Sequence, residues 1–413
     1  MRVLAGKAAE KRVRELAARA SRLDAVEPQV RRIVADVRRN GDRALVKYAR
    51  KWDGLQSGQP LRVAPAEIRA AWKAASSDLR FALEKAAANI RRFCEWQKPA
   101  EWTKKNDGVS LGQLVRPLDS VGCYVPGGRY PLPSTLLMTV IPAQVAGVRE
   151  IRVVSPKPRL QTLAAAAMLG VTEFYRIGGA HAVAALAYGT TSIPRVDKIV
   201  GPGNLYVTAA KKMVAFDCSI DFLAGPTEAV IVAEIGKPEF IAADLVAQAE
   251  HDPEALAMFI SSSRELAEQV VACSERAAKQ NSIARQSLAA SGVALLAASH
   301  AQALEWANLL APEHITVARA DVAAIRSAGS VFVGDYSPQA VGDYASGPNH
   351  VLPTAGAARC RGGLSVLDFL KLITVQELSQ PALRRIGPVA TTLAEAEGLQ
   401  AHAESVRVRC VHA

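Results

Sequence analysis

Histidines beside acidic or amide residues are the sharpest chemical feature of this sequence. Gln248 and His251 end a helical pattern over residues 241–250 and lie three residues apart, so both side chains project from one helix face. That spacing could chelate a metal, although Gln is a neutral oxygen ligand of low specificity. A helix-capping role for His251 before Asp252 explains the same residues without a metal.

Glu313 and His314 form a second candidate site, directly before the apolar run 315–317. An acid next to an imidazole at a loop–strand junction can act as two proton-transfer groups. A solvated strand start is the alternative.

Two further candidate sites lie toward the C-terminus. Residues 342–350 are polar and flanked by glycine, so we expect a loop in which Asp343 and His350 could be a metal ligand and a substrate donor. Glu397 and His402 are five residues apart, so on one helix their directions would differ by about 140°. They could then reach two parts of one substrate but not one ligand atom. Ordinary surface residues remain the alternative for both.

Four of these residues would make a nitrogen and oxygen ligand set suited to zinc: Gln248, His251, Asp343 and His402. The residues are far apart in the chain and no short motif joins them, so spacing alone does not establish the site.

The elements that must position these side chains follow from periodicity. The first hundred residues indicate helices over 25–39, with a stop at Asn40-Gly41, and over 66–96, with a restart cap at Ser77. Short β-branched runs then alternate with helical patterns, which predicts βαβ units and a parallel sheet. The expected strands are 120–125, 150–154, 173–176, 198–200, 229–232 and 257–261. A further α/β portion covers 293–333, and the tail after Leu364 is expected to be helical.

Glycine turns follow three of the expected strands and precede helices. These turns are 126–128, 178–179 and 201–204, and their backbone N–H groups could bind phosphate. The dinucleotide fingerprint G-x-G-x-x-G is absent. Nucleotide binding and tight structural turns both remain open on this evidence.

Composition excludes several classes of protein. The 413 residues suffice for two or three domains, and no uncharged apolar run reaches the length of a membrane span. The net charge of +11 is dispersed and only 5% of residues are aromatic, which argues against nucleic acid as a partner. The six cysteines form no C-x-x-C pair, and no secretory signal is apparent, so we expect reduced thiols in a cytoplasmic protein.

Six motifs in order carry a resemblance to a known family, from about Asp24 to Val408. The motifs are residues 121–128, 201–204, 224–228, 247–251, 312–314 and 342–353. Together they resemble histidinol dehydrogenase. The resemblance implies zinc-dependent, NAD-linked, four-electron oxidation of L-histidinol through L-histidinal to L-histidine, the last steps of histidine biosynthesis.

The family also implies an α/β fold with two incomplete Rossmann-like domains, parallel-sheet cores and small helical N- and C-terminal segments. The implied boundaries are 1–23 for an N-terminal helical arm, 24–123 with 229–364 for the first domain, 124–228 for the second, NAD-contacting domain, and 365–413 for a C-terminal segment that reaches the partner. The implied assembly is a homodimer with shared active sites.

The family's site residues carry over by motif. One zinc ion per subunit would be held by Gln248, His251, Asp343 and His402, and Glu313 and His314 would be the acid–base pair. Substrate would contact Thr227, Gln248, His251, His314, Asp343, His350, Glu397 and His402. Tyr124, His181 and Asn204 would lie at the NAD site.

Two residues depart from the family pattern. Thr227 stands where Ser is usual and keeps the hydroxyl. His181 stands where Gln is usual, after a Gly-Gly turn at a helix start, so we expect a neutral imidazole that donates one N–H to NAD; a helix cap without cofactor contact is the alternative.

Other functions compete with this assignment. A paralogous zinc/NAD dehydrogenase could act on another small amino or sulfonated alcohol. A basic, non-enzymatic binding protein would explain the charge but not the ordered motifs. An aldehyde dehydrogenase with Cys123 as nucleophile is disfavoured, because Cys123 lies in an apolar strand pattern.

Overall fold

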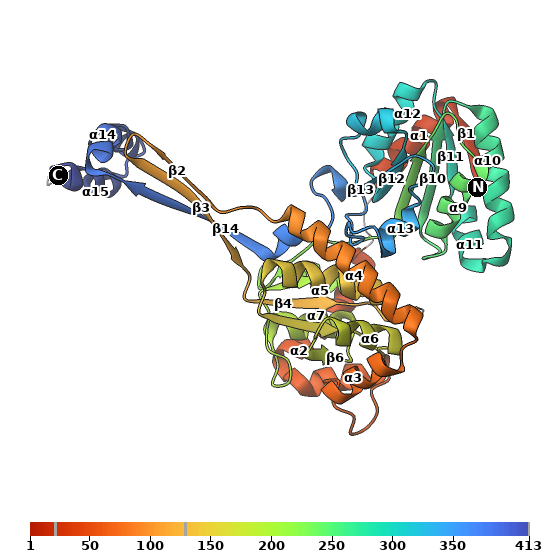
Figure 1. The fold of residues 1–413 in the computed structure, drawn as a ribbon, viewed down its shortest axis with the longest axis horizontal. Coiled ribbons are helices and arrows are strands. Elements are labelled where there is room, and N and C mark those ends of the chain that lie inside the picture. Colours follow the sequence, from red (N-terminus) through yellow and green to blue (C-terminus); the bar gives the residue numbers. More distant parts are fainter. Residues whose placement is uncertain (20–22, 128–129, 412–413) are drawn as a thin grey trace. The chain divides into compact units, whose positions relative to one another are not determined.

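The computed structural model describes residues 1–19, 23–127 and 130–411, so Gly128 of the first glycine turn lies outside the described residues. The chain forms two compact units (Figure 1). Unit 1 comprises Met1–Gln97 and Leu118–Asp368, and unit 2 comprises Lys98–Pro117 and Phe369–Ala413. Unit 1 itself contains two parallel sheets. Sheet A, which contains β9 and β12, and its helices are called lobe A; sheet B, which contains β4 and β7, and its helices are called lobe B.

Lobe B is built on a parallel sheet with the strand order β6-β5-β4-β7-β8. The strands are β4 (Ser120–Tyr124), β5 (Glu150–Val154), β6 (Glu173–Tyr175), β7 (Lys198–Val200) and β8 (Ser219–Ile220). Numbered along the chain, the order is 3-2-1-4-5, the arrangement of dinucleotide-binding sheets. The glycine turns after β4, β6 and β7 therefore meet at the carboxyl edge of one sheet.

Helices cover both faces of this sheet. They are α2 (Glu27–Tyr48), α3 (Pro65–Ala74), α4 (Ser77–Gln97), α5 (Pro133–Ala146), α6 (Leu160–Met168), α7 (Gly179–Tyr188) and α8 (Leu205–Val214). The predicted stop after Asn40 appears as a break in α2 at Gly41, where φ is 50° and ψ is −132°. The predicted helix restart is confirmed, because α4 begins at Ser77, but the capping side chain is Ser76, whose Oγ accepts from Leu79 N at 3.2 Å.

Helices α2, α3 and α4 belong to lobe B, which differs from the expected boundaries. Val30, Ile33 and Val37 of α2 share one buried core with residues of α7 and α8, so α2 packs on the sheet that begins with β4. We expected residues 24–123 to join residues 229–364 instead. Helical periodicity shows which face of a helix is buried but not which sheet buries it, and this is why the boundary was wrong.

Lobe A contains a parallel sheet with the order β1-β11-β10-β9-β12-β13. The strands are β1 (Arg2–Ala5), β9 (Glu228–Val232), β10 (Leu256–Ser261), β11 (Val293–Leu296), β12 (His314–Val317) and β13 (Ser330–Val333). Its helices are α1 (Gly6–Ala17), α9 (Pro238–Ala249), α10 (Arg264–Ala277), α11 (Ser282–Ala290), α12 (His300–Leu310) and α13 (Gln339–Tyr344). Val230 and Val232 face the core formed with α1 and α12, whereas Ile231 faces the core formed with α9, α10 and α11.

The N-terminus is not a separate helical arm. Residues Arg2–Ala5 pair in parallel with β11 and extend sheet A, and α1 packs on that sheet. The run is too short to show a strand period by itself, so the sequence predicted only the helix.

Unit 2 is an antiparallel sheet followed by two helices. The sheet has the order β14-β3-β2, formed by β2 (Trp102–Asn106), β3 (Val109–Pro117) and β14 (Leu370–Leu378). The helices are α14 (Gln380–Ala396) and α15 (Gln400–Val411). The expected all-helical tail is therefore wrong at its start, because residues 370–378 find a strand partner in β3. Among the described residues, no helix is long and apolar enough to cross a membrane.

Candidate active site

A cavity of about 190 Å³ within unit 1 collects most of the residues singled out by the sequence. Seven candidates line it: Thr227, Gln248, His251, Glu313, His314, Asp343 and His350. Lobe B contributes Ser134 and Thr135 from the start of α5. The cavity therefore brings together motifs that lie far apart in the chain.

Strand register explains why Thr227 meets Glu313. Thr227 immediately precedes β9 and Glu313 immediately precedes β12, and these strands are parallel neighbours in which His314 lies opposite Ala229. Both side chains consequently lie at the amino edge of sheet A. Helix α9 returns along the chain to the same edge and delivers Gln248 in its last turn.

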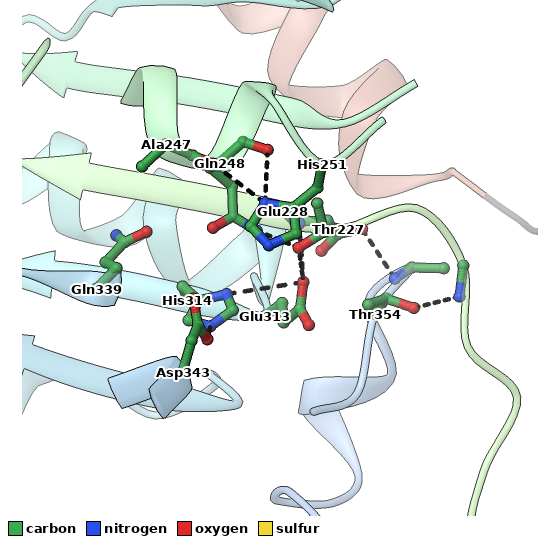
Figure 2. Close-up of polar contacts among 12 residues, drawn as sticks. Thr227, Glu228, Ala247, Gln248, His251, Glu313, His314, Gln339, Asp343 and Thr354 are labelled. Atoms are coloured by element: carbon green, nitrogen blue, oxygen red, sulfur yellow. Dashed lines mark hydrogen bonds and ion pairs between the residues drawn. The ribbon is translucent and has the colours of Figure 1, made fainter. Parts of the chain in front are cut away.

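A chain of hydrogen bonds ends on Glu313 (Figure 2). The Gln248 amide donates to the Thr227 hydroxyl, and Thr227 donates to Glu313 Oε2 at 2.5 Å. The backbone N–H of Glu228 donates to the same oxygen at 2.9 Å. Two donors on one oxygen fix the orientation of the Glu313 carboxylate.

His314 lies between two carboxylates. Its Nε2 is 3.2 Å from Asp343 Oδ1, and its Nδ1 is 3.7 Å from Glu313 Oε2 (Figure 2). Burial lowers the pKa of His314, but the charges of Glu313 and Asp343 and the hydrogen bond to Asp343 outweigh burial and raise the pKa to about 10. Nδ1 is buried and makes no hydrogen bond to any described residue. The imidazole is thus held beside an acid that can exchange a proton with it.

Asp343 and His350 lie on either side of a short helix end. Asp343 is part of α13, so the expected loop 342–350 is wrong over its first three residues. Burial raises the pKa of Asp343, but the hydrogen bond and positive charge of His314 outweigh it and hold the pKa below its usual range. The His350 Nδ1–H donates to the Asp343 carbonyl at 2.6 Å, which leaves Nε2 to accept from Thr135 at 3.3 Å. Burial lowers the pKa of His350, so its neutral form is favoured.

His251 presents a free nitrogen beside this group. It follows α9, and its Nδ1 lies 3.1 Å from the Ala247 carbonyl and 3.3 Å from the Gln248 carbonyl. A neutral ring that donates from Nδ1 carries its lone pair on Nε2, the form that ligates metals. His251 and Asp343 both line the first cavity. Gln248, His251 and Asp343 therefore offer, around one cavity, nitrogen and oxygen donors of the types that zinc accepts.

That donor set is incomplete within unit 1. In the described part of the chain, no three His, Cys, Asp or Glu side chains are grouped as a metal site. The fourth predicted ligand, His402, lies in the first turn of α15 in unit 2 and is exposed, as is Glu397 at the end of α14. Because the two residues lie on different helices, the geometry expected for one helix does not apply.

A second cavity, of about 400 Å³, lies at the carboxyl edge of sheet B and is lined by Tyr124, His181 and Asn204. The Tyr124 hydroxyl accepts from Gly179 N at 2.9 Å. The Asn204 side chain caps α8 by accepting from two backbone N–H groups. The three residues predicted at a cofactor site therefore share one cavity and shape the helix starts around it.

Comparison with known proteins decides the family. The family model described as histidinol dehydrogenase matches residues 16–410. Histidinol dehydrogenase of Methanothermobacter thermautotrophicus is 46% identical over 97% of each chain, and that of Haloarcula marismortui is 48% identical over 94% of each. The crystal structure of histidinol dehydrogenase from Elizabethkingia anophelis matches with a TM-score of 0.93 and 36% identity, covering 99% of this chain and 98% of that one.

The chain belongs to the histidinol dehydrogenase family. Histidinol dehydrogenases are oxidoreductases that act on CH–OH groups, which excludes the non-enzymatic binding protein. The aldehyde dehydrogenase alternative also fails, because burial raises the pKa of the Cys123 thiol to about 12 and leaves it unreactive.

Sequence reasoning missed several residues around this histidinol dehydrogenase site. Thr135 contacts His350, and Thr354 accepts from Gly225 N beside Thr227 at 2.5 Å. The Arg19 guanidinium donates two hydrogen bonds to the buried Glu228 carboxylate, from Nε to Oε1 at 2.6 Å and from Nη2 to Oε2 at 2.5 Å. Glu228 follows the Thr227 position directly, and a charged residue opening an apolar strand was the signal available in the sequence.

Proposed function

We propose that the chain oxidises L-histidinol through L-histidinal to L-histidine with zinc and NAD. The observation that carries this proposal is the connected group in the first cavity, where Gln248, Thr227 and Glu313 form one hydrogen-bonded chain beside His314 and Asp343. An acid, an imidazole and a metal-type donor set then face the same small space.

Gln248, His251 and Asp343 would hold zinc together with His402. Zinc bound there supplies a charge that orients the amine and imidazole nitrogens of the substrate. A cation on Asp343 would offset part of the rise in the pKa of His314, whereas the larger contribution of the Glu313 charge would remain. His314 would be the base for the substrate hydroxyl.

The chain's own residues account for the proton transfers. In the first half-reaction His314 would accept the hydroxyl proton, and bound NAD would supply the hydride acceptor for the carbinol carbon. In the second half-reaction Glu313 would accept a proton from the water that adds to the aldehyde, and a second NAD, when bound, would supply the acceptor for the next hydride. Loss of two hydrides and three protons, with the gain of one water, would thus convert the alcohol to a carboxylate and two NAD to two NADH.

We also propose a homodimer in which unit 2 completes the partner's site. Neighbouring residues of β14 are both exposed, Leu372 at 52% and Ile373 at 45%, so both faces of the unit 2 sheet present apolar side chains. Val389 and Leu393 of α14 are each 61% exposed. Apolar surface on this scale marks a protein interface, and a second copy of the chain would cover it.

The decisive experiment measures NADH formed per substrate. Purified protein loaded with zinc is given L-histidinol at alkaline pH with excess NAD, and we expect two NADH per histidinol and no activity after chelation. Other amino alcohols and sulfonated alcohols serve as comparison substrates. A higher kcat/KM for any of them than for histidinol would favour the paralogous dehydrogenase.

A further inference from the structure

The wall of the second cavity contains a buried carboxylate that the sequence did not suggest. Asp53 ends the π-helical segment η2 (Ala49–Asp53), and its side chain is 6% exposed. Its Oδ2 accepts from Gly178 N at 3.0 Å and lies 2.7 Å from His181 Nε2. Its Oδ1 accepts no hydrogen bond from the residues that the structure describes, and Asp53 lines the cavity. One oxygen is therefore bound by the protein, and no described residue hydrogen-bonds to the other.

The Nε2 of His181 is directed at Asp53 rather than at the cavity. The other ring nitrogen, Nδ1, is buried and has no hydrogen-bond partner among the described residues. The ring also packs against Tyr48 and Trp52, with centroids 5.8 and 5.9 Å away. The expected N–H from His181 to a cofactor is therefore directed at Asp53 instead.

The Asp53 carboxylate lies at the N-terminus of a helix. Gly178 N–H opens α7, and the N-terminus of a helix favours an anion. Here that anion is the Asp53 carboxylate itself. A second negative group at this point would meet like charge in a poorly solvated wall, whereas a hydroxyl could donate to Oδ1.

The orientation of a bound dinucleotide follows from the two cavities. Pro202 lines the first cavity and Asn204 the second, so the two cavities approach each other after β7. The nicotinamide must reach the reacting carbon from that side, which puts the adenosine half toward β5 and β6, near Asp53. In sheets of this order an acid after the second strand usually contacts the adenosine ribose 2′-hydroxyl. The residues after β5 are Ser155, Pro156 and Lys157, and none is acidic.

We propose that Asp53 accepts a hydrogen bond from the 2′-hydroxyl of the adenosine ribose and so selects a dinucleotide without a 2′-phosphate. The proposal rests on the proposed function, because it assumes that NAD binds in the second cavity. In other dinucleotide-binding sheets an acid after the second strand contacts the ribose 2′-hydroxyl. Here Asp53, at the end of η2, takes that role. Lys157 is the opposing charge: its side chain lies over Gly54, where an added Cβ would be 3.0 Å from Lys157 Cε. It is exposed and would attract phosphates of NAD and NADP alike.

Binding titrations test the proposal without turnover. Isothermal titration calorimetry gives Kd for NAD and NADP with wild type, Asp53→Asn, Lys157→Gln and the control Asp42→Asn. Asp42 bonds Ser192 and does not line the cavity. We expect wild type to prefer NAD, and Asp53→Asn to reduce that preference about tenfold, because Asn keeps an acceptor for Gly178 N–H but removes the charge. Lys157→Gln should weaken both dinucleotides and keep the ratio, and Asp42→Asn should change neither.

A second measurement uses wild type alone, in case Asp53→Asn does not fold. AMP and adenosine 2′,5′-bisphosphate compete with NAD, and we expect AMP to bind about tenfold more tightly. Equal affinities of the two, or an unchanged ratio in a folded Asp53→Asn protein, would overturn the role of Asp53 while leaving NAD binding intact. Failure of wild type to bind NAD would overturn both the proposed function and this inference.

Discussion

Thr227 donates its hydroxyl proton to Glu313 while accepting one from Gln248, so a single oxygen connects a proposed metal ligand to the proposed base. The connection crosses from the end of α9 to the start of β12 through the residue before β9. A change in the position of Gln248 would therefore change the hydrogen bond that Thr227 donates to the Glu313 carboxylate.

Removing this hydroxyl should slow turnover while a smaller hydroxyl residue should not. Thr227→Val leaves Glu313 without one donor, and loss of a hydrogen bond to a charged group costs about 1.5–3 kcal/mol, or about tenfold to a hundredfold in kcat/KM. Thr227→Ser keeps the donor and should stay within about threefold of wild type. Steady-state kinetics of both variants with histidinol check this, and equal losses would show that only the methyl group matters.

His251→Ala should lose zinc while remaining folded. The free Nε2 of His251 is the nitrogen donor that unit 1 offers to the predicted site, so zinc per subunit measured by mass spectrometry should fall well below wild type. His300→Gln is the matched control, because His300 bonds Glu234 and Asp321 outside the cavity. Full zinc occupancy in His251→Ala would remove this residue from the ligand set.

Glu313→Gln should impair aldehyde oxidation more than alcohol oxidation. Only the second half-reaction needs an activated water, and Gln cannot accept its proton. The comparison is the rate with histidinal against the first NADH formed from histidinol in a single turnover. Equal losses in both would mean that Glu313 orients its neighbours rather than serving as the base for water.

Two inactive variants should restore activity when mixed. If His402 completes the neighbour's site, a heterodimer of His251→Ala and His402→Ala chains contains one intact site and one site with both defects. Activity near half of wild type per dimer is expected after subunits are exchanged and heterodimers are isolated. Heterodimers with no activity would place His402 in the site of its own subunit.

Asp244 should make stability depend on pH. Burial raises the pKa of this α9 carboxyl to about 6, against a hydrogen bond from the Gln339 backbone that lowers it. Because the folded pKa lies above the unfolded value, the stabilising contribution is present below about pH 4 and is lost as pH rises through 6. Asp244→Asn should therefore raise Tm relative to wild type at pH 8 but not at pH 4, and Glu239→Gln on the same helix should show no such change. A Tm difference independent of pH would contradict the shift.

The sequence predicted the helices and strands better than it predicted which of them are neighbours in the fold. The strands at 120–125, 150–154 and 198–200 followed from β-branched runs, and the structure confirms them as β4, β5 and β7. The joining of Thr227 to Glu313 depends on β9 and β12 being neighbours, which periodicity does not encode. The same limit hid Asp53, because its polar neighbours come from turns after other strands.

The exposed strand β14 shows a second limit. Most of its residues are exposed, so neither alternation nor a buried run distinguishes it from a helix within one chain. Its partner β3 lies far earlier in the sequence. The prediction relied on hydrophobic periodicity and on strand partners that are close in sequence. Because β14 is exposed and its partner is distant, it shows neither feature.

The pairing of β3 with β14 also sets an order of events during synthesis. Val109 of β3 pairs with Leu378 of β14, so the hairpin of β2 and β3 emerges from the ribosome long before its third strand. A two-stranded hairpin is marginal alone, and its open edge can pair wrongly until β14 arrives. Closing so distant a pair is slow, which makes unit 2 the last part of the chain to fold. A nascent chain halted before residue 370 would hold both complete parallel sheets and still lack the surface through which we propose it assembles.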